Sequence, residues 1–264
     1  MSPKLILYTF GGSVWASDMF NSSPHLAVLE LNYGDAVELE TEGENFKPEF
    51  LAKFSPFYSN SNGTLPTLET PGKTLADTTE VIEYLIENAP SKVKSGNAAF
   101  IKEIHDDKYD PNCKLLLARD DKELSAKANG FPAQFIVGRQ RALQATAAFR
   151  TSTWAVPEDV KNGFFKQSQS VFENVLTYLY TILPKKLPDS GFLGGEVPGE
   201  DDFHLGAWLT RIALTCGAQS ADDGLEKIAA SFGKPLSPKV EAPGVLEGLE
   251  RPIELEGGLQ WGLH

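Results

Sequence analysis

The sequence predicts an α/β domain over residues 1–92 followed by an all-helical domain over residues 97–264. Short β-rich runs alternate with helical patterns in the first ninety-odd residues, and beyond residue 95 the β-rich runs end. The stretch from Pro90 to Asn97 reads as a linker between them. Glycine, proline and glutamate dominate the tail after about residue 235, which we expect to be irregular.

The first elements of the α/β domain follow from local patterns. Residues 4–10 are apolar and β-rich and predict a strand, which Gly11 and Gly12 end. Apolar residues have helical spacing over residues 24–31, and they alternate with polar residues, as in a strand, over residues 36–41. Residues 47–54 predict a short helix.

The rest of this domain is marked by proline and by a helix cap. Pro66 cannot donate to a central ladder, so we expect it at the start or edge of a strand over residues 64–68. Pro71 and Gly72 predict a turn into a second short strand. Asp77 or Thr78 can then cap a helix whose buried face carries apolar residues. The predicted order is β-α-β-α-β-β-α.

Two long helices are predicted in the second domain. Residues 164–183 carry an apolar stripe, and we expect Pro184 to end that helix. Residues 203–216 carry another stripe, on which Cys216 is expected to be a packed core residue.

Charge and cysteine content exclude several classes. The net charge of −12 argues against binding a nucleic-acid backbone. The only two cysteines are Cys113 and Cys216, which form neither a disulfide framework nor a zinc-ligand set. We find no apolar run long enough for a signal peptide or a membrane span, and we expect a cytoplasmic protein. His105-Asp106-Asp107 is interpreted as a solvated helix face, and we expect no metal site.

Four stretches together resemble the glutathione transferase family. They are Leu65-Pro66-Thr67-Leu68, Asp77-Thr78 before an apolar helix, the segment from Leu7 to Ala16, and the segment from Gly199 to Leu209. The nearest likeness is to a fungal-type group with serine rather than cysteine at the N-terminal active-site position. The resemblance implies a thioredoxin-like domain followed by the family's helical domain, in which Asp202 is similar to the buried capping aspartate.

The resemblance implies a site for glutathione as co-substrate. In the family, the peptide bond before the proline corresponding to Pro66 is cis, and the backbone of the residue before it, Leu65 here, pairs with the cysteinyl part of glutathione. Asp77 and Thr78 would hold the γ-glutamyl end, where a helix N-terminus favours a carboxylate. Without the resemblance, a trans proline in an edge strand and an ordinary helix cap explain the same residues.

The resemblance also implies a catalytic residue that donates a hydrogen bond to the glutathione thiolate. Counting from the first strand, Ser13 takes that place. The segment from Ser13 to Gly34 is several residues longer than the family normally allows, with the excess at residues 18–23. A second, smaller excess lies at residues 57–61. Other candidates therefore stay open: Tyr8, Ser17, Ser22 and Ser23.

The function that the resemblance implies is conjugation of glutathione to small hydrophobic electrophiles, as in detoxification. No cysteine precedes Cys113, which argues against the thiol-transfer chemistry of the cysteine-bearing members. A non-catalytic member that binds ligands or other proteins is the alternative. The resemblance further implies a homodimer.

Overall fold

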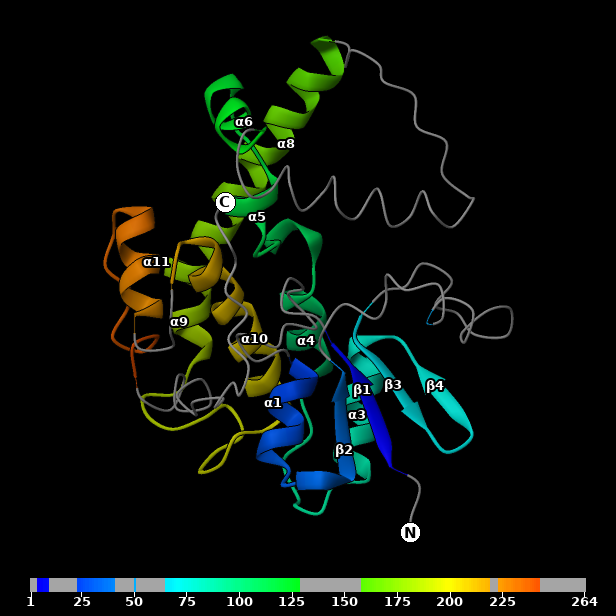
Figure 1. The fold of residues 1–264 in the computed structure, drawn as a ribbon. Coiled ribbons are helices and arrows are strands. Elements are labelled where there is room, and N and C mark those ends of the chain that lie inside the picture. The colour runs from blue at the N-terminus through cyan, green and yellow to red at the C-terminus, as the bar shows by residue number, and fades with distance from the viewer. Residues whose placement is uncertain are drawn as a thin grey trace.

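The computed structural model describes residues 4–9, 23–40, 50, 65–128, 158–218 and 223–242. Within them a four-stranded sheet lies on one side of the molecule, and the long helix α8 extends away from it (Figure 1). The strands are β1 (Leu5–Tyr8), β2 (Val37–Glu40), β3 (Thr67–Thr70) and β4 (Lys73–Leu75).

The sheet is mixed, with the strand order β2-β1-β3-β4. β1 runs parallel to β2, and it runs antiparallel to β3 with Tyr8 opposite Thr67. β3 and β4 form a hairpin in which Leu68 faces Leu75, and Gly72 in its turn has a φ of 104°. The accompanying helices are α1 (Ser23–Glu30), the short 3-10 helix η1 (Gly34–Ala36) and α3 (Thr78–Glu87). This β-α-β unit followed by a hairpin and a helix is a thioredoxin-like domain.

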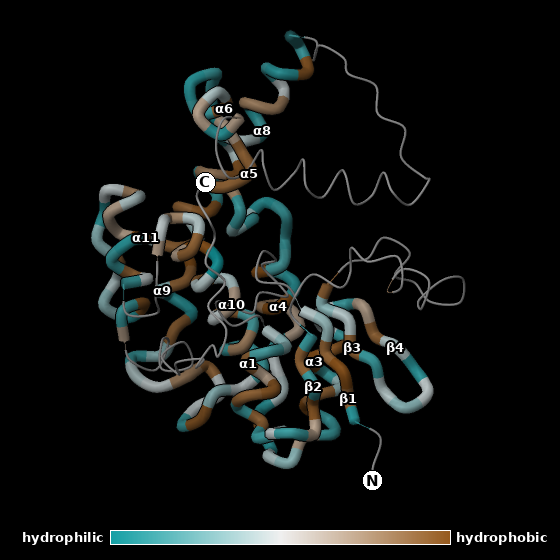
Figure 2. Tube along the Cα trace, viewed as in Figure 1, coloured by the Kyte–Doolittle hydropathy of each residue, from teal (hydrophilic) through white to brown (hydrophobic). Residues whose placement is uncertain are grey.

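Side-chain alternation divides the sheet into two faces. Leu7 of β1 and Leu68 of β3 are fully buried in one core with the apolar residues of α1 and α3. Tyr8, the next residue of β1, packs instead against Phe50. Figure 2 shows β1 in the colour of hydrophobic residues, as expected for a central strand that is covered on both faces.

The rest of the described chain is helical. Its elements are α4 (Ala98–Ile104), η3 (Asp107–Tyr109), α5 (Cys113–Leu116), α6 (Asp121–Ala128), α8 (Glu158–Thr177), η4 (Tyr178–Ile182), α9 (Leu183–Lys186), α10 (Glu200–Thr215) and α11 (Gly224–Phe232). α10 is the central helix, since every residue from Phe203 to Ala213 is buried. Trp208 is fully buried, and its indole N–H donates to the carbonyl of Tyr109 at 2.8 Å.

Most predicted elements are confirmed, but Pro184 does not end its helix. The helix begins earlier than expected, at Glu158, passes through a π-helical segment, Tyr178–Ile182, and continues to Lys186. Proline is tolerated in the first turn of a helix, where an N–H lacks an intrahelical partner. The π segment places Pro184 in such a first turn, that of α9. The helix predicted over residues 47–54 lies outside the described residues except for Phe50, which is helical.

Cys216, expected to be a packed core residue, lies against the helical core. It is partly buried, and Cys113 is buried within that core. Burial raises the pKa of the Cys113 thiol to about 12, so that thiol stays protonated at neutral pH. The described part of the tail, residues 235–242, forms no helix or strand, although Leu236 and Val240 are buried in the helical core.

Candidate functional site

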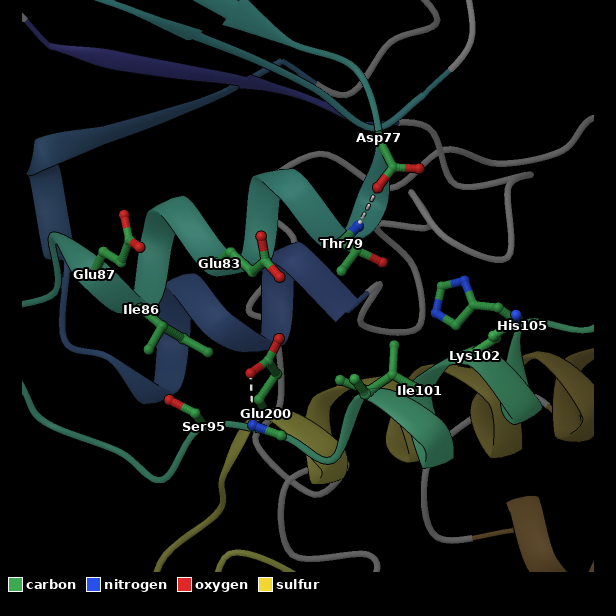
Figure 3. Close-up of a pocket in the computed structure, with 12 residues that line it drawn as sticks. Asp77, Thr79, Glu83, Ile86, Glu87, Ser95, Ile101, Lys102, His105 and Glu200 are labelled. Carbon is green, nitrogen blue, oxygen red and sulfur yellow. Dashed lines mark hydrogen bonds between the residues drawn. The ribbon is translucent and has the colours of Figure 1, made fainter.

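The N-terminus of α3 is capped by Asp77. Its Oδ1 atom accepts hydrogen bonds from the backbone N–H groups of Thr79 at 2.9 Å and Glu80 at 3.1 Å. Figure 3 shows the other carboxylate oxygen pointing away from the helix. Thr78, the first residue of α3, is buried. The capping role considered from sequence is therefore real, and it leaves one oxygen of Asp77 turned outward.

The start of β3 lies beside this helix end. The Leu65–Pro66 peptide bond is cis, as the resemblance implies. Pro66 is buried, and Leu65 is half-buried. β3 and β4 are antiparallel, so the start of β3, just after Pro66, and the end of β4, two residues before Asp77, lie at the same end of the hairpin. The two predicted binding segments, Leu65–Pro66 and Asp77–Thr78, therefore lie at the same end of the sheet.

The N-terminus of α1 lies at the same end of the sheet. β1 and β2 are parallel, so α1 must run back between them and begin near the C-terminal end of β1. The helix begins at Ser23, whose side chain is fully buried and whose Oγ has no hydrogen-bond partner among the described residues. Pro24 follows, in the early helical position that proline favours. Ser13, Ser17 and Ser22 lie outside the described residues.

Tyr8, the other candidate in this region, is engaged elsewhere. Its hydroxyl donates to the Glu69 carboxylate at 3.2 Å, and its ring meets that of Phe50 edge-on at 5.0 Å. Its side chain therefore lies on the sheet face opposite the core formed with α1 and α3.

A cavity of about 640 Å³ opens where α3, α4, the linker and the start of α10 meet (Figure 3). Its lining is formed by Asp77, Thr79, Glu83, Ile86, Glu87, Ser95, Gly96, Ala98, Ile101, Lys102, His105 and Glu200. Glu83 on α3 and Glu200 on α10 point toward each other across it. Burial, together with the charge of Glu83, raises the pKa of Glu200. The cavity thus joins the N-terminus of α3 to the helical region.

His105 at the end of this cavity corrects one interpretation. The sequence favoured a solvated helix face, but Nε2 of His105 lies 2.8 Å from Nδ1 of His204, in hydrogen-bond contact. His105 is half-buried and His204 fully buried. Because 99 residues separate His105, the C-cap residue of α4, from His204 in α10, no sequence spacing signals the pair. Among the described residues there is no group of three or more histidine, cysteine or acidic side chains that could hold a metal ion.

The Asp202 cap of α10 is confirmed. Its carboxylate accepts the backbone N–H groups of Leu193, Gly194 and Gly199 at 2.7–2.9 Å. Gly199, at the N-cap position, has no side chain with which to complete a reciprocal cap. Sequence analysis missed the two neighbouring carboxylates, Glu200 and Asp201, which accept the N–H groups of Gly96 and Asn97 in the linker.

The sheet order, the cis-proline before β3 and the helical second region define a thioredoxin-like domain with a helical extension. Residues 7–93 match the family model of the glutathione S-transferase N-terminal domain, which runs from β1 to the linker. This match covers the thioredoxin-like domain and most of the linker. None of the helices within the described ranges is both long and apolar enough to cross a membrane.

Several solved structures are similar to the chain at low sequence identity. Glutathione transferase F7 from Populus trichocarpa is 19% identical, with 94% of this chain and 100% of that chain covered and a TM-score of 0.47. The β-etherase LigF from Sphingobium sp. strain SYK-6 is 16% identical over 95% and 100% of the two chains, with a TM-score of 0.49. A glutathione transferase homologue from Sulfitobacter, solved with bound glutathione, is 15% identical over 87% and 92%, with a TM-score of 0.43. No curated protein sequence matches the chain.

Proposed function

We propose that this protein is a glutathione transferase that conjugates the thiolate of glutathione to small apolar electrophiles. The observation that carries the proposal is that three chain segments lie at one end of the sheet: Pro66 just before β3, the N-terminus of α3 at Thr78 and the N-terminus of α1 at Ser23. The family match from residue 7 to 93 spans all three and supports the same ligand.

The peptide part of glutathione would lie along this end of the sheet. Backbone groups of Leu65, beside Pro66, would pair with the cysteinyl residue. The γ-glutamyl carboxylate would take the Thr78 hydroxyl and the N–H groups at the start of α3, where the helix dipole favours an anion. The outward oxygen of Asp77 would accept the γ-glutamyl ammonium as a charge-assisted hydrogen bond.

Among the candidate catalytic serines, we propose Ser23. A thiol becomes a better nucleophile at neutral pH when a hydrogen-bond donor and a helix N-terminus stabilise its thiolate. Ser23 supplies both, because it begins α1 and its hydroxyl makes no hydrogen bond within the described part of the chain. Ser13, the first choice by counting from the strand, stays a prediction, as do Ser17 and Ser22.

Tyr8 is a weaker candidate, because its hydroxyl already donates to Glu69 and its ring lies on the other sheet face. The alternative function is a non-catalytic protein of this fold that binds glutathione or other ligands. We also propose a cytoplasmic homodimer. A sedimentation mass of a single chain at micromolar concentration would contradict the dimer.

Replacing Ser23 by Ala tests the catalytic assignment. Loss of one preorganised donor should lower kcat for a standard aromatic electrophile by roughly 100-fold, with the Kd for glutathione nearly unchanged. The matched control is Ser168→Ala, since Ser168 in α8 is also fully buried and its hydroxyl has no partner within the described ranges, but it belongs to the helical region. That variant should keep full turnover.

Other outcomes contradict separate parts of the proposal. Full turnover in Ser23→Ala would move the thiolate donor to Ser13, Ser17 or Ser22, each tested by the same substitution. Glutathione binding without turnover in the unmodified protein would support the ligand-binding alternative. Absence of glutathione binding would contradict the proposed function altogether.

A further inference from the structure

Two helices, α3 and α4, form facing walls of the cavity (Figure 3). Thr79, Glu83 and Glu87 follow one another at intervals of four residues along one face of α3. The opposite face of α3 is buried with the sheet, in the core that contains Leu7 and Leu68. The cavity side of α3 therefore places two carboxylates, Glu83 and Glu87, about 6 Å apart along the helix axis.

Negative charge dominates the lining of this cavity. Four of the described lining residues are acidic: Asp77, Glu83, Glu87 and Glu200. Lys102 is the one lysine or arginine among them. Burial lowers the pKa of His105 to about 4, so its ring adds no charge at neutral pH. Within the described part of the chain, none of the four carboxylates forms an ion pair. The cavity therefore attracts a cationic ligand and repels an anionic one.

Glu200 is the buried member of this set, with 6% of its surface exposed. Its Oε2 atom accepts the backbone N–H of Gly96, whereas its other oxygen has no hydrogen-bond partner among the described residues. Figure 3 shows that second oxygen pointing into the cavity, toward the carboxylate of Glu83. Burial and the charge of Glu83 raise the pKa of Glu200. A cationic donor between the two carboxylates would fill the vacant acceptor and remove the repulsion between like charges.

The size and the apolar part of the lining indicate what kind of cation fits. The volume of about 640 Å³ lies in the range of small-molecule sites and is far larger than a bare ion needs. Among the residues that the structure describes, no three histidine, cysteine or acidic side chains come together as metal ligands do. Ile86, Ala98 and Ile101 add apolar surface between the acidic groups. Acidic groups that alternate with apolar surface match a flexible chain in which ammonium groups alternate with methylene groups.

We propose that this cavity is a binding site for an aliphatic polyamine, a ligand separate from glutathione. One ammonium group donates to Glu200 and Glu83, and a second donates to Glu87, one helical turn further along α3. These are charge-assisted hydrogen bonds. The methylene groups between them pack against Ile86 and Ile101.

Calorimetric titration of the unmodified protein with spermidine tests the site. We expect saturable binding of one spermidine molecule per chain. The titration is made at physiological ionic strength, because Glu83 and Glu87 are exposed and salt screens non-specific attraction to exposed charges. An aliphatic diol of the same length, which has no positive charge, should not bind.

Variants that remove one charge each locate the bound spermidine. Glu200→Gln keeps an acceptor for the Gly96 N–H and should raise the Kd for spermidine by about 10-fold, because its charge is buried. Glu83→Gln should raise the Kd by about fivefold, since that carboxylate is more exposed. Lys102→Gln should lower the Kd by about threefold, because it removes a like charge from the cavity. The control is Glu80→Gln, an exposed position of α3 outside the lining, and it should change the Kd by less than about twofold.

Three results would overturn the inference. They are the absence of saturable spermidine binding, equal binding of the uncharged diol, and equal weakening by Glu80→Gln and Glu83→Gln, which would show a response to overall charge alone. Should Glu200→Gln not fold, Glu83→Gln and Lys102→Gln still decide the matter. Glutathione binding is measured separately, so failure of the polyamine site leaves the transferase proposal standing, and the reverse also holds.

Discussion

The backbone N–H of Gly96 donates to the carboxylate of Glu200 at 2.6 Å and so ties the linker to the first residue of α10. Asn97 donates in the same way to Asp201 at 2.8 Å. In return, the backbone N–H of Glu200 donates to the carbonyl of Lys94 at 3.2 Å. These bonds fix the linker along the cavity wall, where Gly96 and Glu200 are both lining residues.

Glu200→Ala should lower the free energy of unfolding by about 1–3 kcal/mol, because it leaves the Gly96 N–H without its partner. Urea denaturation gives this value directly. Glu196→Ala is the control, since that side chain is exposed, and it should change stability by less than about 0.5 kcal/mol. Equal stability of the two variants would show that the linker contact contributes nothing.

Asp202 should be the most sensitive carboxylate of this helix end. Asp202→Ala leaves the N–H groups of Leu193, Gly194 and Gly199 unpaired, and we expect a loss of at least about 3 kcal/mol. Asp202→Asn keeps one carbonyl acceptor and should lose less. If both variants unfold at the concentration of urea that unfolds the original protein, the cap has no such role.

Tyr178→Phe should stabilise the protein. The Tyr178 hydroxyl is buried without a hydrogen-bond partner in the described ranges, while its ring packs against those of Tyr109 and Trp208. Removing an unsatisfied buried hydroxyl should raise the free energy of unfolding by about 1 kcal/mol. Tyr180→Phe is the contrasting variant, because the Tyr180 hydroxyl donates to the carbonyl of Lys234 and its removal should destabilise. A lower stability of Tyr178→Phe would contradict the prediction.

Stability should fall as the pH drops below about 6.5. Burial lowers the pKa of His25 and His105 to about 4 and, with a contribution from His105, that of His204 to about 3, so the unfolded chain takes up protons at these rings before the folded protein does. Their contribution is complete above pH 6.5 and is lost toward pH 4, at up to about 1.4 kcal/mol per pH unit for each histidine. The raised pKa values of Glu200 and Asp202 act in the opposite direction.

A variant with one fewer histidine isolates this effect. His204→Asn should show a shallower loss of stability between about pH 7 and about pH 5 than the unmodified protein, as measured by urea denaturation at each pH. Identical pH dependence of the two proteins would contradict the assigned direction.

The sequence alone predicts the structural elements that depend on residues close together in the chain. Apolar spacing predicts α3 and α10, and the Pro-Gly pair predicts the β3–β4 turn, whereas the Asp202 cap of α10 was implied by the family resemblance. Each of these depends on residues within one or two turns of each other, so the chain order contains the information.

Contacts between distant segments were not predictable. His105 meets His204 across 99 residues, and Gly96 meets Glu200 across 104. Each depends on how the helices pack, and no periodicity encodes that. The π-helical segment Tyr178–Ile182 also escaped prediction, because proline after an apolar stripe ordinarily marks a helix end. Ser23 was one candidate among several serines, and only its place at the start of α1 led us to propose it.

Calorimetric titration with glutathione tests the central claim most directly. S-methylglutathione, which lacks the free thiol, serves as a second probe that separates binding from reaction. We predict saturable binding of both by the unmodified protein, roughly 10-fold weaker binding by Thr78→Val, and unchanged binding by Thr74→Val on β4. Absence of binding to either compound, or equal affinity in Thr78→Val, would contradict a glutathione site at the N-terminus of α3.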